Sequence, residues 1–129
     1  MVLVVDDDEG VRENVVECLE AKGFGCWSAA SADEALLLLR QESIAPDVVL
    51  TDLTMPGMAV GRFVAALEAT AAAGVPVLVM TGACERDFPA WLDPEQVLAK
   101  PFGGHRLFEA VAGAVAACRA RGGGGLAAA

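Results

Sequence analysis

Basic residues are scarce in this sequence of 129 residues. It has nine Lys and Arg against eighteen Asp and Glu, which gives a formal net charge of −9 at pH 7. Surfaces that bind nucleic acids or anionic membranes need basic patches, so neither partner is expected. An acidic balance mostly favours solubility and does not assign a function by itself.

Long hydrophobic runs are also missing. The stretch Ala69–Cys84 carries no charge, but it is too short to span a bilayer and is interrupted by Gly74 and Pro76. The N-terminal residues do not have the basic and apolar segments of a secretory signal. We therefore expect a cytoplasmic protein without a membrane association.

Metal-binding cysteine and histidine patterns are absent as well. None of the four cysteines forms a C-x-x-C pair, so a zinc site is not expected; they are Cys18, Cys26, Cys84 and Cys118. In a reducing cytosol we expect them to be small core or surface residues. The single histidine, His105, is expected to be solvated at the start of a helix rather than to carry a phosphoryl group.

Short apolar runs alternate with longer amphipathic stretches along the chain. The runs predict strands at Met1–Val5, Cys26–Ala29, Val48–Thr51, Val75–Met80 and Val97–Ala99. The amphipathic stretches predict helices at Gly10–Lys22, from Ser31 through Gln41, at Gly61–Ala73, Arg86–Leu92 and Arg106–Arg121. Continuous apolar strands alternating with helices indicate an α/β domain with a parallel sheet covered on both faces. We assign residues 1–121 to this domain and 122–129 to a flexible Gly/Ala tail, either a linker or a cloning remnant.

Two helix boundaries have local signals. Ser31 and Glu34 form a capping box, in which the serine is the N-cap of the helix that follows. Gly23 follows the first predicted helix and ends it.

Polar residues follow four of the five predicted strands. In open parallel sheets, binding sites lie beyond the carboxyl ends of the strands. The residues at those positions are Asp6, Asp7, Asp52, Thr81 and Lys100. We therefore expect three carboxylates, a hydroxyl and an ammonium group to meet at one edge of the sheet.

This set of groups is suited to phosphoryl transfer. Three converging carboxylates repel one another unless a hard cation lies between them, and oxygen ligands with open positions suit Mg²⁺. Lys100 and Thr81 can bind the remaining oxygens of a phosphoryl group, and Asp52 can act as the nucleophile that forms an acyl phosphate.

Four segments resemble the receiver domain of two-component response regulators. They are "VLVVDDDEGVRENV", "PDVVLTDLTMPG", "VPVLVMTG" and "LAKPF". The resemblance covers roughly Val2 to Ala117. It implies a (βα)₅ flavodoxin-like, CheY-like fold with a five-stranded parallel sheet in the order 2-1-3-4-5.

The resemblance also implies the role of each site residue. Asp52 would accept a phosphoryl group from a histidine kinase or a histidine phosphotransfer domain. Asp7, Asp52 and the main-chain carbonyl of Thr54 would bind Mg²⁺ directly, and Asp6 would act through a metal-bound water. The protein would be a signalling domain that assists its own phosphorylation and dephosphorylation, rather than an enzyme with a separate substrate.

Further roles follow from the same resemblance. Thr81 and Lys100 would hold the phosphoryl oxygens, and the peptide bond from Lys100 to Pro101 would be cis. Self-association on phosphorylation stays open.

Three features depart from the common receiver pattern. Val97 stands where many receivers have an aromatic switch residue, three positions before the lysine. The segment from Thr81 to Lys100 is short and contains Pro89. The turn "MPGMAVGR" is one residue longer than the common "MPGMDG", which resembles receivers fused to hybrid sensor kinases.

Two alternatives remain. A phosphatase of the haloacid-dehalogenase type would use an Asp-x-Asp motif after the first strand, which Asp6-Asp7-Asp8 fits. That family needs a further acidic pair after the lysine. The phosphatase alternative also gives no role to Asp52. A receiver-like scaffold that has lost phosphorylation is the second alternative.

Overall fold

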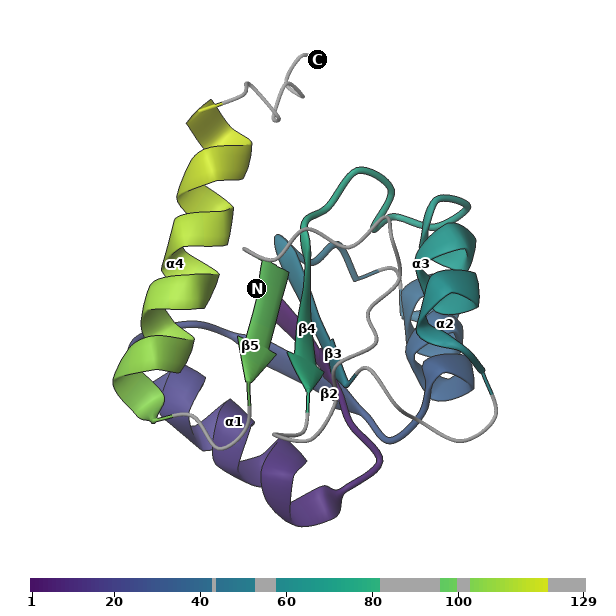
Figure 1. Ribbon diagram of the computed structural model, residues 1–129. Coiled ribbons are helices and arrows are strands. Elements are labelled where there is room, and N and C mark those ends of the chain that lie inside the picture. Colours follow the sequence, from purple (N-terminus) through teal and green to yellow (C-terminus); the bar gives the residue numbers. More distant parts are fainter. Residues whose placement is uncertain (43, 53–57, 82–95, 100–102, 121–129) are drawn as a thin grey trace.

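Five parallel strands form one sheet in the computed structural model, which describes residues 1–42, 44–52, 58–81, 96–99 and 103–120 (Figure 1). The strands are β1 (Val2–Val5), β2 (Cys26–Ala29), β3 (Val48–Asp52), β4 (Val77–Thr81) and β5 (Val97–Ala99). Their order is β2-β1-β3-β4-β5, and each neighbouring pair is parallel. This confirms the predicted fold class and strand order.

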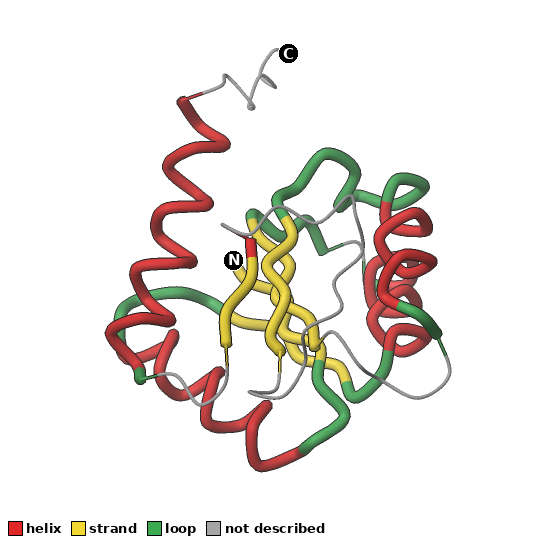
Figure 2. Tube along the Cα trace, viewed as in Figure 1, coloured by secondary structure: helices red, strands yellow, loops and turns green. Residues whose placement is uncertain are grey.

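Helices cover both faces of the sheet (Figures 1 and 2). One face carries α1 (Glu9–Ala21) and α4 (Gly104–Ala120), which contact each other. The opposite face carries α2 (Ala32–Gln41) and α3 (Val60–Leu67). Among the described residues, no helix is both long enough and apolar enough to cross a membrane.

The alternation of side chains along β1 divides the core into two layers. Val2 and Val4 pack with residues of α1 and α4, whereas Leu3 and Val5 pack with residues of α2 and α3. All four side chains are fully buried. A strand that is apolar at every position is therefore needed, because both of its faces are covered.

The two predicted helix-boundary signals lie at helix ends, and of the capping box the serine half forms. The side chain of Ser31 is the N-cap of α2 and accepts a hydrogen bond from the N–H of Glu34 at 3.1 Å. Gly23, after α1, has a φ of 95°, a left-handed conformation that glycine adopts without strain.

The third helix is shorter than predicted. The sequence indicated Gly61–Ala73, but α3 ends at Leu67. Beyond it the chain makes tighter turns, in which the N–H of Thr70 donates to the carbonyl of Leu67. The hydroxyl of Thr70 donates to the same carbonyl at 2.6 Å, so it competes with the continuation of the helix.

Other boundaries shift by one or two residues, and some predicted features lie outside the described residues. β3 extends to Asp52, β4 runs from Val77 to Thr81, and α4 begins at Gly104. The predicted helix Arg86–Leu92, the Lys100–Pro101 bond and the tail 122–129 all lie outside the described part of the chain.

Candidate functional site

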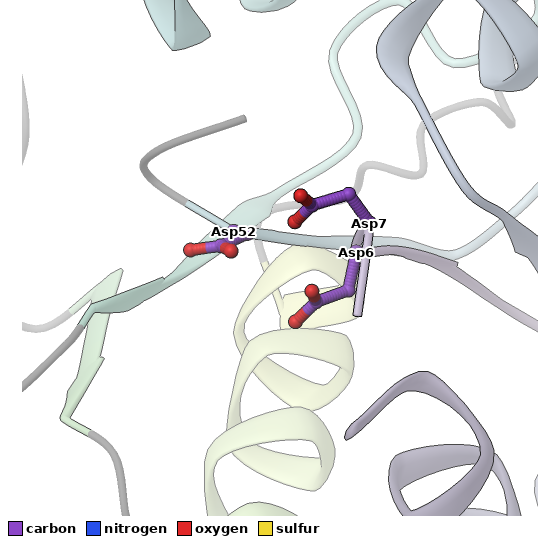
Figure 3. Close-up of side chains that lie close together, drawn as sticks. All are labelled: Asp6, Asp7 and Asp52. Atoms are coloured by element: carbon purple, nitrogen blue, oxygen red, sulfur yellow. The ribbon is translucent and has the colours of Figure 1, made fainter. Parts of the chain in front are cut away.

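Three carboxyl groups come together at the carboxyl edge of the sheet. Asp6 and Asp7 directly follow β1, and Asp52 is the last residue of the adjacent strand β3. Val5 and Thr51 are register partners, so the residues after them meet at the same level. Each aspartate offers one oxygen, and these oxygens lie within 4.8 Å of one another (Figure 3). The sequence predicted this cluster, and the structure forms it.

The three aspartates differ in their exposure. Asp6 is fully buried and Asp52 is 9% exposed, whereas Asp7 is exposed to solvent. Like charges this close repel one another, and burial strengthens the repulsion. A cluster of hard oxygen donors with one side open to water suits a divalent cation such as Mg²⁺, which keeps several of its waters. The residues present therefore fit a magnesium ion.

Hydrogen bonds fix Asp6 in place. Its N–H donates to the carbonyl of Ala29 in β2 at 3.1 Å. Oδ1 of Asp6 accepts from the N–H of Asp8 at 2.9 Å, and the carbonyl of Asp6 accepts from Nη1 of Arg12 at 2.8 Å. The first aspartate of the acidic run is thus bound through its main chain and its side chain.

Asp8 has a different role from its two neighbours. It is the N-cap of α1, and its Oδ1 accepts a hydrogen bond from the N–H of Val11 at 3.1 Å. An acidic side chain at this position satisfies a main-chain donor at the helix start and interacts favourably with the helix dipole. Sequence reasoning missed this cap because it placed the helix start at Gly10.

Thr81 lies at the same edge of the sheet. It is the last residue of β4 and is 2% exposed. Its register neighbour on β5 is Ala99, and Asp52 on β3 pairs with Met80, the residue before Thr81. The hydroxyl-bearing residue therefore ends the strand next to Asp52, as predicted. Lys100 and Thr54 lie outside the described residues.

The histidine and two of the cysteines lie in simpler surroundings. His105 is exposed in the first turn of α4, as expected for a solvated residue. Its Nε2 lies 3.5 Å from Oε2 of Glu109. Cys18 and Cys26 are free thiols. Burial, with a smaller contribution from Glu20, raises the pKa of the Cys26 thiol to about 11. A thiol with this pKa is a poor nucleophile near neutral pH.

Curated relatives cover most of this chain. It is 34% identical over 116 residues to the C4-dicarboxylate transport transcriptional regulatory protein DctD of Rhizobium meliloti, a match that covers 84% of this chain. It is 35% identical over 114 residues to the response regulator protein FleR of Pseudomonas aeruginosa, covering 86% of this chain. The matched regions make up 24% of each relative, so the chain spans about a quarter of their length.

Solved structures and the family comparison agree with these relatives. The chemotaxis protein CheY4 of Vibrio cholerae has 26% sequence identity and a TM-score of 0.70, over 88% of this chain and 96% of that one. Residues 2–112 match the response regulator receiver domain. Since this match spans most of the sequence, the chain belongs to the response regulator receiver domain family.

Proposed function

We propose that Asp52 is the phosphoacceptor of this receiver domain, and that its donor is a histidine kinase or a histidine phosphotransfer domain. The observation that carries the proposal is the place of Asp52 at the end of β3, with an oxygen within 4.8 Å of oxygens of Asp6 and Asp7. A nucleophile beside two further carboxylates needs a cation to react with an anionic phosphoryl group.

Asp6, Asp7 and Asp52 would hold the magnesium ion, together with the main-chain carbonyl of Thr54. When bound, Mg²⁺ would neutralise the carboxylates and the phosphoryl oxygens. The hydrogen bond from the N–H of Asp8 occupies one oxygen of Asp6. This supports a role for Asp6 through water, with Asp7 and Asp52 as the direct ligands.

The transfer itself is carried by Asp52. Its carboxylate oxygen forms a bond to phosphorus while the bond from phosphorus to the donor histidine nitrogen breaks, and the imidazole keeps that electron pair. The hydroxyl of Thr81 and the ammonium group of Lys100 bind the phosphoryl oxygens in our proposal. Such charge-assisted contacts stabilise the product, and they change when phosphate is gained or lost.

The wider context of the domain is also a proposal. The longer turn "MPGMAVGR" favours a receiver fused to a hybrid sensor kinase. DctD is named a transcriptional regulatory protein, so attachment to a transcriptional regulator is the other context. In both contexts we propose a cytoplasmic domain that acts through conformational change.

The proposal is tested by incubating the protein with acetyl phosphate and Mg²⁺ and measuring its intact mass. We expect one added phosphoryl group that requires Mg²⁺ and is lost in the Asp52→Asn variant. The matched control is Asp47→Asn, which makes the same change just before the start of β3. Turnover of a generic aryl phosphate without stable labelling would instead support the phosphatase alternative, and no labelling at all would support the inactive scaffold.

A further inference from the structure

Arg12 reaches back from the first turns of α1 to the end of β1. Its Nη1 donates to the main-chain carbonyl of Asp6 at 2.8 Å, across six residues of sequence. The N–H of Arg12 donates to the carbonyl of Asp8 at 2.9 Å, so the residue is anchored in the helix while its side chain spans the loop. The side chain is partly buried rather than free in solvent.

The carbonyl that Arg12 binds belongs to the peptide unit joining Asp6 to Asp7. A peptide unit is planar, so a contact that fixes its carbonyl also fixes the turn of the chain between the two residues. That turn sets the directions in which the side chains of Asp6 and Asp7 leave the main chain. Both carboxylates extend toward Asp52 in Figure 3.

Repulsion among the carboxylates of Asp6, Asp7 and Asp52 opposes the arrangement in which they face one another. Three like charges within 4.8 Å favour any rotation that separates them. The bond from Asp8 N–H restrains the side chain of Asp6, but it does not hold the peptide unit that leads to Asp7. The described contact that does so comes from Arg12, whose guanidinium is planar and permanently charged.

We propose that Arg12 is a positioning residue, which holds the Asp6–Asp7 peptide unit so that both carboxylates face Asp52 ready for a metal ion. This inference rests on the proposed function, because it concerns the same magnesium site. Arg12 is not itself a ligand and acts only through the main chain of Asp6.

The sign of the effect separates this role from a simple effect of charge. Removing a cation beside three carboxylates makes the site more negative, and electrostatics alone would then strengthen Mg²⁺ binding. Loss of a positioning contact weakens it, because the ligands must be reordered when the ion binds. Substitution of residues that orient metal ligands typically lowers affinity by about 10- to 100-fold.

Isothermal titration with Mg²⁺ tests the inference on wild type, Arg12→Met, Arg12→Lys and a matched control, Arg40→Met. Arg40 is exposed in the last turn of α2. Arg40→Met changes the net charge of the protein by the same amount as Arg12→Met. We expect Arg12→Met to bind Mg²⁺ about tenfold more weakly. Arg12→Lys should bind with an intermediate affinity, because it keeps the charge but not the planar fork, and Arg40→Met should bind like wild type.

Urea unfolding in EDTA establishes that the variants fold, and should Arg12→Met fail to fold, Arg12→Lys carries the same comparison. Amide exchange in the metal-free protein gives a readout without Mg²⁺: the N–H of Asp8 should exchange faster in the Arg12 variants than in Arg40→Met. Mg²⁺ affinity in folded Arg12→Met equal to or tighter than that of wild type would overturn the inference. If wild type itself fails to bind Mg²⁺, the proposed function fails, and exchange at Asp8 still decides whether Arg12 holds the loop.

Discussion

The main-chain N–H of Asp8 donates to Oδ1 of Asp6 at 2.9 Å. Two residues of one acidic run are thereby joined, although they serve different purposes. Asp6 contributes an oxygen to the cluster with Asp7 and Asp52, whereas the side chain of Asp8 caps α1. The acidic run after β1 is therefore divided between Asp6 and Asp7, which belong to the carboxylate cluster, and Asp8, which caps the helix.

The first prediction concerns Asp8. Asp8→Ala should lower the free energy of unfolding by about 1 kcal/mol, because the N–H of Val11 loses its cap. Asp8→Asn should cost little, since asparagine caps helices about as well as aspartate. Urea unfolding in EDTA measures both. Mg²⁺ affinity should stay within about threefold of wild type in Asp8→Asn; a complete loss of binding in this variant would mean that Asp8 is a ligand.

The second prediction concerns Asp7, the exposed member of the carboxylate cluster. Asp7→Asn removes one of three like charges within 4.8 Å, so the metal-free protein should gain stability of the order of 1 kcal/mol. Mg²⁺ should raise the melting temperature of the wild-type protein by mass action. At a Mg²⁺ concentration one hundred times its dissociation constant, the free energy of unfolding should rise by about 2.7 kcal/mol. The same addition of Mg²⁺ should leave the melting temperature of Asp7→Asn unchanged.

Thermal unfolding with EDTA or with Mg²⁺ measures both effects of Asp7→Asn. The matched control is Asp33→Asn, an exposed acidic position in the first turn of α2. This control should keep the full response to Mg²⁺. A wild-type melting temperature that ignores millimolar Mg²⁺ would count against a preformed metal site.

The third prediction concerns the hydroxyl of Thr81. Thr81→Ala should slow labelling by acetyl phosphate at least about tenfold, because a donor to the phosphoryl oxygens is lost. Thr81→Ser keeps the hydroxyl and should label at nearly the wild-type rate. Both variants lose the same buried methyl group, so the comparison isolates the hydroxyl. Equal rates in the two variants would contradict the assignment of Thr81.

The fourth prediction concerns Cys26, whose pKa is raised to about 11 by burial and by Glu20. The folded protein holds this thiol proton more tightly than the unfolded chain does. The associated stability is complete below the ordinary pKa of the thiol and is lost as the pH rises toward 11. In Cys26→Ala this loss between about pH 9 and 11 should be absent.

Alkylation with iodoacetamide at pH 8 provides a kinetic check on Cys26. In the folded protein its thiolate should be about a hundredfold scarcer than that of an ordinary thiol, so it should react slowly. In urea it should react at an ordinary rate. Peptide mass spectrometry separates its labelling from that of Cys18, and rapid labelling of Cys26 in the folded protein would refute the prediction.

The sheet and the acidic cluster could be predicted because parallel sheets tie sequence to position. Strands that are apolar at every residue must be buried on both faces, and the residues after them must meet at one edge. Asp6, Asp7 and Asp52 follow from that rule without knowledge of their contacts. Thr81 follows from it as well, even though β4 begins two residues later than predicted.

Local competition between interactions was harder to predict. The alanines of the segment 69–73 favour a helix, but the hydroxyl of Thr70 and the tight turns after Leu67 end α3 earlier. The cap at Asp8 was missed because the helix was predicted to begin at Gly10, whereas α1 begins one residue earlier, at Glu9. The contact from Arg12 to the carbonyl of Asp6 has no sequence signature, because it depends on the path of the loop between them.

The central claim, that Asp52 accepts the phosphoryl group, is tested most directly by locating that group on the chain. After incubation with acetyl phosphate and Mg²⁺, hydroxylamine converts an aspartyl phosphate to a hydroxamate, which tandem mass spectrometry assigns to one residue. We predict modification of Asp52 in wild type and none in Asp52→Asn. A hydroxamate on Asp6 or Asp8, with the same extent of labelling in Asp52→Asn, would contradict the account.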